Sequence, residues 1–154
     1  MRSLRAIGSA LAGIAIALVV AGCATPAAPD PDAHMAAFSA KLTGGNQVPP
    51  VVTVATGQLY AALDRNTLLL RWKLAFSGLS GPVTKVHFHG PVTLGPNANS
   101  ALSIDGPLFK SPVEGRVTLA AAQATELLSG RWYVSLQTKA HAKGEIRGQL
   151  IVHE

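Results

Sequence analysis

His87 and His89 are the residues whose type and spacing point most directly to chemistry. In a β-strand, side chains two positions apart leave the same face of the sheet, and their Cα atoms are separated by about 6–7 Å. Neutral imidazole nitrogens suit copper and zinc, so two of them at this spacing could share one ion. A stable site needs three or four ligands. The candidates for a further ligand are His141 and Glu145, and the more distant His34 and His153.

A different interpretation of the two histidines needs no metal. Val86 and Phe88 alternate with them and would face the core, so both imidazoles would lie on the outer surface as ordinary polar groups. The His-x-His strand is also similar to the copper-ligand strand of copper-zinc superoxide dismutases, but the second, bridging set of His and Asp is missing from the sequence. Three hypotheses follow. We favour a non-enzymatic binding or structural module over a copper- or zinc-binding protein, and both over a dismutase-like redox enzyme.

Other kinds of chemistry find less support in the sequence. It contains no Gly-x-Ser-x-Gly nucleophile motif. Gly44-Gly45-Asn46 predicts a turn rather than a phosphate-binding loop, because no helix start follows it. The 13 Lys and Arg residues are scattered singly, with no basic cluster or aromatic platform, so nucleic acid is not an expected partner.

Short alternating segments are the elements that must position these side chains. A period of two, typical of half-buried antiparallel strands, recurs at 38–43, 58–63, 68–76, 85–89, 102–104, 113–119, 132–137 and 145–152. By this alternation Trp72 and Trp132 belong to the core. The segment 120–129 is instead rich in Ala, Gln, Glu and Leu and precedes Gly130, which predicts a short helix with a glycine stop. The sequence therefore predicts an all-β fold: an antiparallel, Greek-key-like β-sandwich of about eight strands with one short helix near 120–129.

The last two predicted strands allow a pairing register to be derived. With the connecting loop at 139–144, three polar pairs would face each other, namely Gln137 with Glu145, Ser135 with Arg147, and Tyr133 with Gln149. Leu136 would then pack beside Ile146 on the inner face, as hairpin parity requires. This register predicts a polar ladder on the outer face, formed by Tyr133, Gln137, Arg147 and Gln149. Glu145 and Arg147 share one face of their strand and could be catalytic, but we favour an exposed cross-strand ion pair as their role.

The N-terminal residues are typical of an exported lipoprotein. Arg2 and Arg5 precede an uncharged apolar run over 6–22, which is the layout of a secretory signal peptide. Small residues before Cys23 resemble the lipobox cleaved by the lipoprotein signal peptidase, so 1–22 would be removed and Cys23 would carry acyl chains. An uncleaved membrane helix is the rival interpretation, although about 17 apolar residues lie at the short end of what spans a bilayer.

The residues that follow Cys23 predict the remaining organisation. Together with the lipidated cysteine, the Pro- and Ala-rich stretch up to residue 35 predicts an extended tether over 23–35, followed by one folded domain over 36–154. Ala24 resembles the residue that sorts Gram-negative lipoproteins to the outer membrane, where the domain would face the periplasm. The expected partners are the membrane, through the lipid, and an unidentified envelope protein or small ligand. Because Cys23 is the sole cysteine, the domain forms no intramolecular disulfide.

Several motifs, taken in order, are similar to the CHRD (chordin-like) domain family. They are the opening Phe38 to Pro50 with its Val-Pro-Pro, the element His87 to Pro91, and the closing Gly144-Glu145-Ile146-Arg147-Gly148-Gln149. The resemblance covers 38–151 and implies an exported β domain, since bacterial members are mostly small exported proteins, but it implies little about biochemical function. Two positions depart from the family pattern. Gln47 stands where Glu is usual, and Gln137 stands where His is frequent, which removes an imidazole from the polar ladder.

Overall fold

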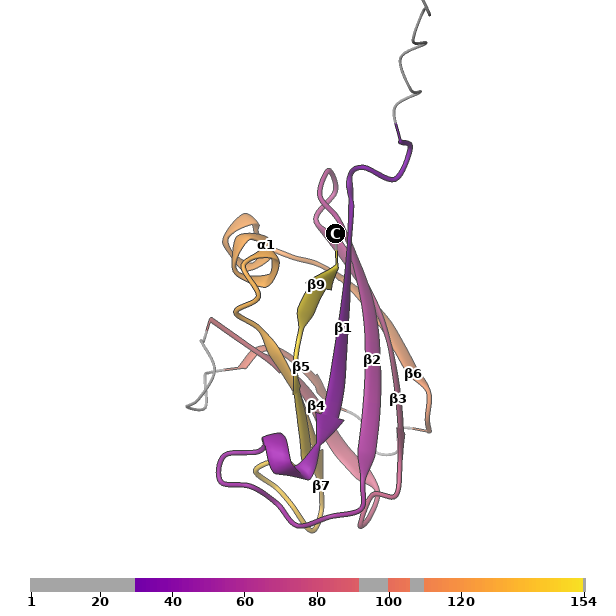
Figure 1. Ribbon diagram of the computed structural model, residues 1–154, viewed down its shortest axis with the longest axis vertical. Helices are drawn as coiled ribbons and strands as arrows, with labels where there is room; N and C mark the ends of the chain where they lie inside the picture. Colours follow the sequence, from indigo (N-terminus) through magenta and orange to yellow (C-terminus); the bar gives the residue numbers. More distant parts are fainter. Residues whose placement is uncertain (1–29, 92–99, 106–109, 154) are drawn as a thin grey trace, which may run out of the picture.

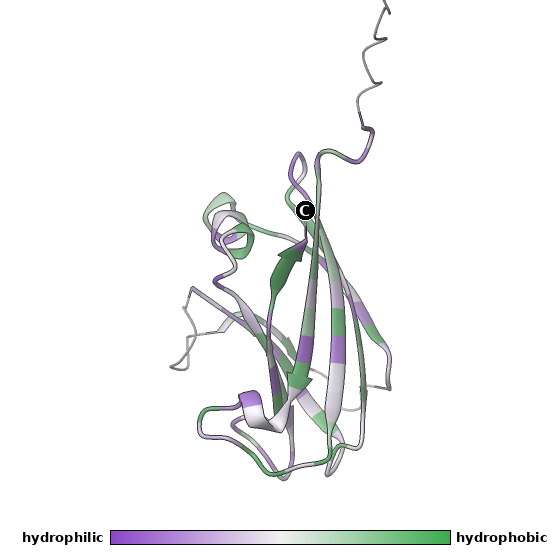
Figure 2. Cartoon of the chain, viewed as in Figure 1, coloured by the Kyte–Doolittle hydropathy of each residue, from purple (hydrophilic) through white to green (hydrophobic). Residues whose placement is uncertain are grey.

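Alternation of buried and more exposed side chains marks the strands in the computed structural model, which describes residues 30–91, 100–105 and 110–153. In β1 (Met35–Thr43), the side chains of Ala36, Phe38, Ala40 and Leu42 are buried, while those between them are not. Colouring by hydropathy shows the same banding along β1 and its neighbours (Figure 2). The period-two pattern therefore forms strands for the expected reason, which is that one face of each strand packs on the core.

Nine strands and two short helices make up the described part of the chain. After β1 come the 3-10 helix η1 (Gly44–Asn46), β2 (Thr56–Asp64), β3 (Leu69–Ser77), β4 (Val83–His89), β5 (Ser100–Asp105), β6 (Val113–Thr118), α1 (Ala121–Leu128), β7 (Tyr133–Thr138), β8 (Ile146–Gln149) and β9 (Ile151–His153). No helix among the described residues is long and apolar enough to cross a bilayer. The predicted signal peptide, Cys23 and most of the predicted tether lie outside the described residues.

The strands form one antiparallel sheet that curls until its two halves face each other (Figure 1). The order is β5-β4-β7-β8-β1-β2-β3-β6, and β9 also pairs with β1. β8 meets β1 only at Thr43, opposite Arg147, whereas β9 pairs near the start of β1, where Ala37 lies opposite His153. The predicted all-β sandwich is confirmed, with its two layers joined along β1.

The core lies between the two halves of the curled sheet. Trp72 on β3 packs edge to face against Phe88 on β4, with ring centroids 5.4 Å apart, which connects one half to the other. Trp132 is also buried, so both tryptophans lie in the core as predicted. The helix α1 covers one end of the sandwich with the buried side chains of Ala124 and Leu127 (Figure 1).

The ends of two elements show where the sequence pattern succeeds and where it fails. The helix α1 stops as predicted at Gly130, which has a positive φ of 68° and donates its N–H to the Leu127 carbonyl. The single last strand predicted over 145–152 is wrong in detail. The chain leaves β8 at Leu150 and resumes as β9, because the first half pairs with β7 and the second with β1.

Candidate functional site

The polar ladder predicted for the last hairpin is present. β7 and β8 pair with Tyr133 opposite Gln149, Ser135 opposite Arg147, and Leu136 opposite Ile146, which is the predicted register. On its other edge β7 pairs with β4, so that His87 lies opposite Ser135 and His89 lies opposite Tyr133. The outer face of β4, β7 and β8 therefore gathers the polar cluster that we call the polar stack, formed by His87, His89, Tyr133, Ser135, Gln137 and Arg147.

The polar stack does not face open solvent, which corrects the prediction of an outer, exposed ladder. Tyr133, Ser135 and Arg147 expose only 2%, 3% and 5% of their surface. The chain after β1 folds back over this face: Asn46 Nδ2 donates to the Arg147 carbonyl at 3.1 Å, and Gln47 Nε2 donates to Ser135 Oγ at 3.2 Å. Hydrogen bonds in such a sheltered site are electrostatically stronger than those on an open surface.

Tyr133 lies at the centre of the stack, between an imidazole and a guanidinium. The His89 ring lies nearly parallel to the Tyr133 ring, at an interplanar angle of 13° and with centroids 4.6 Å apart. The Arg147 guanidinium carbon lies 3.5 Å from the Tyr133 ring centroid. Because β7 runs between β4 and β8, these two partners approach Tyr133 from opposite neighbouring strands. Burial lowers the pKa of Arg147 while Tyr133 opposes that shift, and the cation–π contact helps to hold this buried cation.

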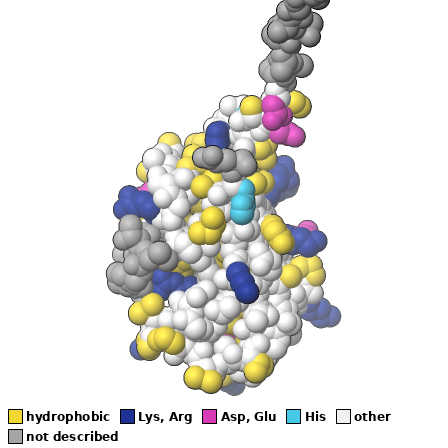
Figure 3. Space-filling view, in the orientation of Figure 1, with side chains coloured by type: hydrophobic (Ala, Val, Ile, Leu, Met, Phe, Trp, Pro, Cys, Tyr) yellow, Lys and Arg dark blue, Asp and Glu magenta, His cyan; other side chains and the backbone are white. Residues whose placement is uncertain are grey.

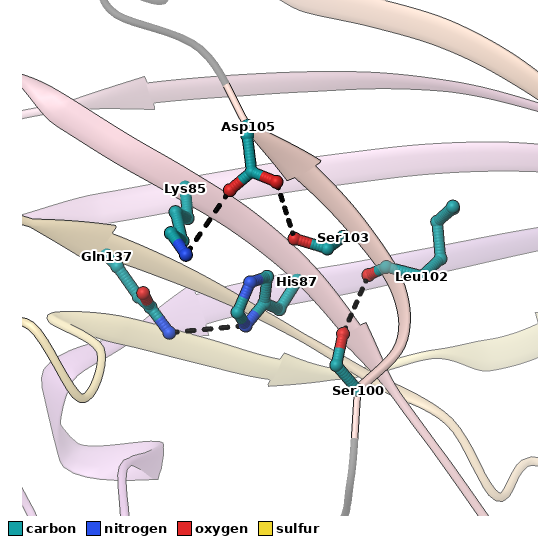
Figure 4. A network of polar contacts seen from close by, with 7 residues as sticks. All are labelled: Lys85, His87, Ser100, Leu102, Ser103, Asp105 and Gln137. Atoms are coloured by element: carbon teal, nitrogen blue, oxygen red, sulfur yellow. Dashed lines mark hydrogen bonds and ion pairs between the residues drawn. The ribbon is translucent and has the colours of Figure 1, made fainter.

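His87 belongs to the stack and uses only one of its ring nitrogens within the described part of the chain. Its Nδ1 lies 3.3 Å from Gln137 Nε2, whereas its Nε2 is buried and has no hydrogen-bond partner among the described residues (Figure 4). Burial, helped by the positive charge of Lys85, lowers the pKa of His87, and Asp105 only partly opposes this. Lys85 and Asp105 themselves form an ion pair of 3.4 Å above the ring. The His87 imidazole is therefore held in its neutral form near pH 7, the form that binds metals.

The four residues predicted as metal ligands do not come together. The rings of His87 and His89 are neighbours, with centroids 5.4 Å apart. His141 instead lines a pocket between loops, and the oxygens of Glu145 are taken by other residues. His153 bonds to Ser39 Oγ through Nε2 at 2.7 Å. Within the described ranges, no group of three or more His, Cys, Asp and Glu could hold a metal ion.

The Glu145 carboxylate is buried, so the predicted exposed ion pair with Arg147 is wrong. Oε1 accepts hydrogen bonds from Thr53 Oγ1 and from the Ser80 N–H, each at 2.9 Å. Oε2 accepts from the hydroxyls of Ser80 and Thr138, each at 2.7 Å. Burial acts to raise the pKa of Glu145, but these hydrogen bonds outweigh it and hold the pKa below its usual value. One ionised side chain thus connects the loop before β2, the loop before β4 and the end of β7.

A pocket of about 290 Å³ opens between residues 47–51 and residues 140–144, which directly precede Glu145 in the chain. Val48, Pro49 and Pro50 give it an apolar wall, and His141 and Lys143 give it basic groups. We call it the loop pocket. Apolar side chains gather at the same end of the molecule in the space-filling view, where the loop between β1 and β2 lies (Figure 3). No sequence pattern predicted the pocket. The one available signal was the run of Val and Pro at 48–52, which has no alternation to bury it.

Fold and site together define the class of protein. It is a small antiparallel β-sandwich with a half-buried polar stack on one outer face and a loop pocket at one end. The polar stack and the loop pocket are joined by Gln47, which lines the pocket and bonds to Ser135 of the stack. Such an arrangement is suited to recognition, because a few placed polar groups beside apolar lining are what a binding site requires.

The chain belongs to the CHRD domain family, whose model matches residues 38–150. No curated protein matches the chain, and no solved structure does. Membership confirms the resemblance carried by the Val-Pro-Pro, His-x-His-Gly-Pro and Gly-Glu-Ile-Arg-Gly-Gln elements. The domain identifies the folded part of the chain as a non-enzymatic binding or structural module.

Proposed function

We propose that this CHRD protein is exported, is anchored to the cell envelope by a lipid on Cys23, and acts there as a binding module. The observation that supports this most is the placement of the loop pocket. β1 starts at Met35 at one end of the sandwich and leads to the pocket loops at the other end (Figure 1). Nine strand residues span about 30 Å. A domain tethered at its N-terminus would therefore present the pocket on the side remote from the lipid.

The anchor itself is argued from the sequence. Arg2 and Arg5, the apolar run over 6–22 and the small residues before Cys23 have the order of a lipoprotein signal. Several acyl chains on one cysteine hold a protein firmly, whereas a single chain binds reversibly. Ala24 would direct the lipoprotein to the outer membrane of a Gram-negative cell. The Pro- and Ala-rich tether would then keep the folded domain clear of the lipid headgroups.

The anchoring is tested with Cys23→Ala in cells fed a labelled fatty acid. We expect the native protein to incorporate label and to sediment with membranes. The variant should stay unlabelled and unprocessed, because the lipoprotein signal peptidase acts on the acylated cysteine. Intact mass of the native protein must correspond to a chain beginning at Cys23 plus acyl groups. A native protein that keeps residues 1–22 would instead support the uncleaved membrane helix and refute the lipoprotein.

The ligand of the loop pocket is proposed to be a small molecule with an apolar body and an anionic group. The apolar wall of the pocket would contact the apolar body of the ligand, and Lys143 and His141 would attract its anionic group. Octanoate is a suitable first probe in a nuclear magnetic resonance titration. Shifts should be confined to 47–51 and 140–144 and should vanish in Ala140→Trp, which fills the pocket. Octanoate shifts that persist in that variant, or none in the native protein, would contradict the proposed pocket.

Metal binding is a second candidate function, favoured by the unused Nε2 of His87. As placed, Gln137 Nε2 donates to Nδ1, and the neutral ring then carries its proton on Nε2. A metal at Nε2 beside His89 requires the Gln137 amide to turn its oxygen toward Nδ1, which moves the proton to Nδ1 and frees the Nε2 lone pair. Copper(II) and zinc titrations of the native protein and of His87→Ala/His89→Ala test this, with His153→Ala as the matched control. Metal affinity unaffected by the double substitution would refute the site, and so would a native protein that binds neither ion.

A further inference from the structure

The outer face of β1, β2, β3 and β6 is open and carries most of the unbalanced charge of the domain. Its charged and aromatic side chains, which we call the basic face, are Lys41, Tyr60, Arg71, Lys73, Glu114 and Arg116. All six are exposed. The register places Tyr60 beside Lys73 and Lys73 beside Glu114, with Arg71 and Arg116 in the next row. Dark blue side chains appear along the edge of Figure 3 where β3 and β6 lie.

Two arginines of the basic face lie directly opposite each other. Arg71 on β3 pairs with Arg116 on β6, so their Cβ atoms are about 4.5–5.5 Å apart. Like charges in directly opposed positions destabilise a sheet. The nearby carboxylate of Glu114 already forms an ion pair of 2.8 Å with Lys73. Within the part of the chain that the structure describes, neither Arg71 nor Arg116 forms an ion pair. Asp64, the second carboxylate of this face, instead accepts hydrogen bonds from the N–H groups of Asn66 and Thr67. The fold thus places two cations together without an ion-pair partner among the described residues.

The positive charge of the basic face can be compared with the net charge of the chain after Cys23. Residues 23–154 contain eleven Lys and Arg against eight Asp and Glu, an excess of three positive charges. The outer face of these four strands has four cations against two carboxylates, Glu114 and Asp64, an excess of two. Most of the excess charge of the chain after Cys23 therefore lies on this face. A protein with one positive face attracts a polyanion in a defined orientation.

The shape of the basic face suits a chain that lies flat on it. Tyr60 exposes 62% of its surface and lines one of two shallow depressions on this face. One of about 380 Å³ lies over Ala62 and Arg71, and the other, of about 460 Å³, lies over Ala75 and Lys41. The alanines leave room at the floor of each depression. Tyr60 is the one exposed large apolar side chain on these four strands. A protein partner is disfavoured, because protein interfaces centre on clusters of such side chains. A single-stranded nucleic acid is disfavoured for a similar reason, because it needs several aromatic side chains for stacking.

We propose that the basic face binds an acidic polysaccharide. Sugar rings would pack on the exposed Tyr60 ring and settle into the two depressions. Carboxylate or sulfate groups of the polymer would bind between Arg71 and Arg116 and relieve their repulsion. The proposal is independent of the lipid anchor and of the loop pocket, since it uses the opposite half of the sheet.

Binding of polygalacturonate and dextran sulfate to the detergent-solubilised full-length protein tests the proposal, with neutral dextran as the negative control. Arg71→Gln/Arg116→Gln should weaken binding roughly three- to thirtyfold, the range for loss of two exposed ion pairs. Arg131→Gln/Lys139→Gln removes the same charge elsewhere and should leave the affinity within about twofold of the native value, because the attraction is short-ranged in salt. Tyr60→Ala should weaken binding roughly threefold, for about 30 Å² of ring uncovered.

The thermal stability of Arg116→Gln separates a binding role from a structural role, because replacing a structurally important residue would lower stability. Arg116→Gln should raise the midpoint of thermal unfolding by about 1–4 °C, because it removes like-charge repulsion, while it weakens polysaccharide binding. The proposal is refuted if neither polymer binds, or if both double variants lose affinity equally. It is also refuted if polyglutamate or anionic phosphatidylglycerol vesicles bind as tightly as the polysaccharides, since charge alone would then suffice.

Discussion

Replacing Glu145 by Gln and by Ala should give two clearly separated losses of stability. The carboxylate accepts four hydrogen bonds in a buried position, and hydrogen bonds to a charged group contribute about 1.5–3 kcal/mol each, roughly twice those between neutral groups. Glu145→Gln keeps the shape and lets the two hydroxyls on Oε2 turn to accept from the new amide. The weaker bonds are offset in part by the lower cost of burying a neutral group, so we expect a loss of about 1–2 kcal/mol.

Glu145→Ala removes all four acceptor contacts and leaves the Ser80 N–H and three hydroxyls without their partner. Buried groups left unsatisfied cost about 1–3 kcal/mol each when water cannot reach them, and the new cavity admits some water. The expected loss of about 3–5 kcal/mol is of the size that the removal of one partner from a buried charged pair produces. Urea unfolding at pH 7 measures both losses. Glu114→Gln, which breaks an ion pair more than half exposed on both sides, should change stability by less than about 0.5 kcal/mol.

The pH dependence separates the charge of Glu145 from its shape. The pKa in the folded protein lies below the unfolded value of 4.5, so ionised Glu145 binds its proton less readily when folded. Its stabilisation is therefore complete above about pH 5 and is lost as the pH falls from 4.5 through the folded pKa. The stability difference between the native protein and Glu145→Gln should shrink in that window. A constant difference from pH 7 to pH 3, or a Gln variant as stable as the native protein at pH 7, would refute the proposed role of the charge.

Three further substitutions test the fold around the site. Gly144→Ala should lower the free energy of unfolding by about 1–3 kcal/mol in urea titrations, because φ is 119° and a Cβ would lie within 3.0 Å of Gln47 and Ser135. Leu127→Ala should cost about 2–5 kcal/mol, measured the same way, since this buried side chain docks α1 on the sandwich. Val54→Thr should change the free energy of unfolding by no more than about 0.5 kcal/mol, because that side chain is almost wholly exposed. A large loss in Val54→Thr would mean that the loop packs against something.

Local sequence pattern was sufficient for most of the strands and for the register of the last hairpin, although it merged β8 and β9 into one strand. Tyr133 faces Gln149 and Ser135 faces Arg147 as parity requires, because hairpin pairing fixes faces over a short separation. The same parity failed at Glu145. Gly144 has a positive φ that takes the chain out of the strand geometry, so Glu145 turns toward Ser80 and Thr138 instead of standing in the ladder. Gly144, directly before the predicted strand, was the sequence signal that strand geometry could be broken at Glu145.

The burial of the polar stack could not be derived from the sequence in the same way. It depends on Asn46 and Gln47 reaching Arg147 and Ser135, which are 101 and 88 positions away in the chain. No periodicity within a segment specifies a contact of that kind. The burial of the two tryptophans, by contrast, could be predicted from the sequence. A large apolar side chain at an inward-facing strand position is most stable in the core, and both tryptophans are buried.

The exposure of Val52 and Val54 follows from the hydrogen-bond network around Glu145. Thr53 lies between them and turns inward to donate to Glu145, so in an extended segment its two neighbours must point outward. They expose 102% and 88% of their surface, and the fold gains nothing from them as apolar residues. Serine or threonine would serve the fold equally well at both positions. The inward turn of Thr53 therefore accounts for the exposure of both valines without any contribution from core packing.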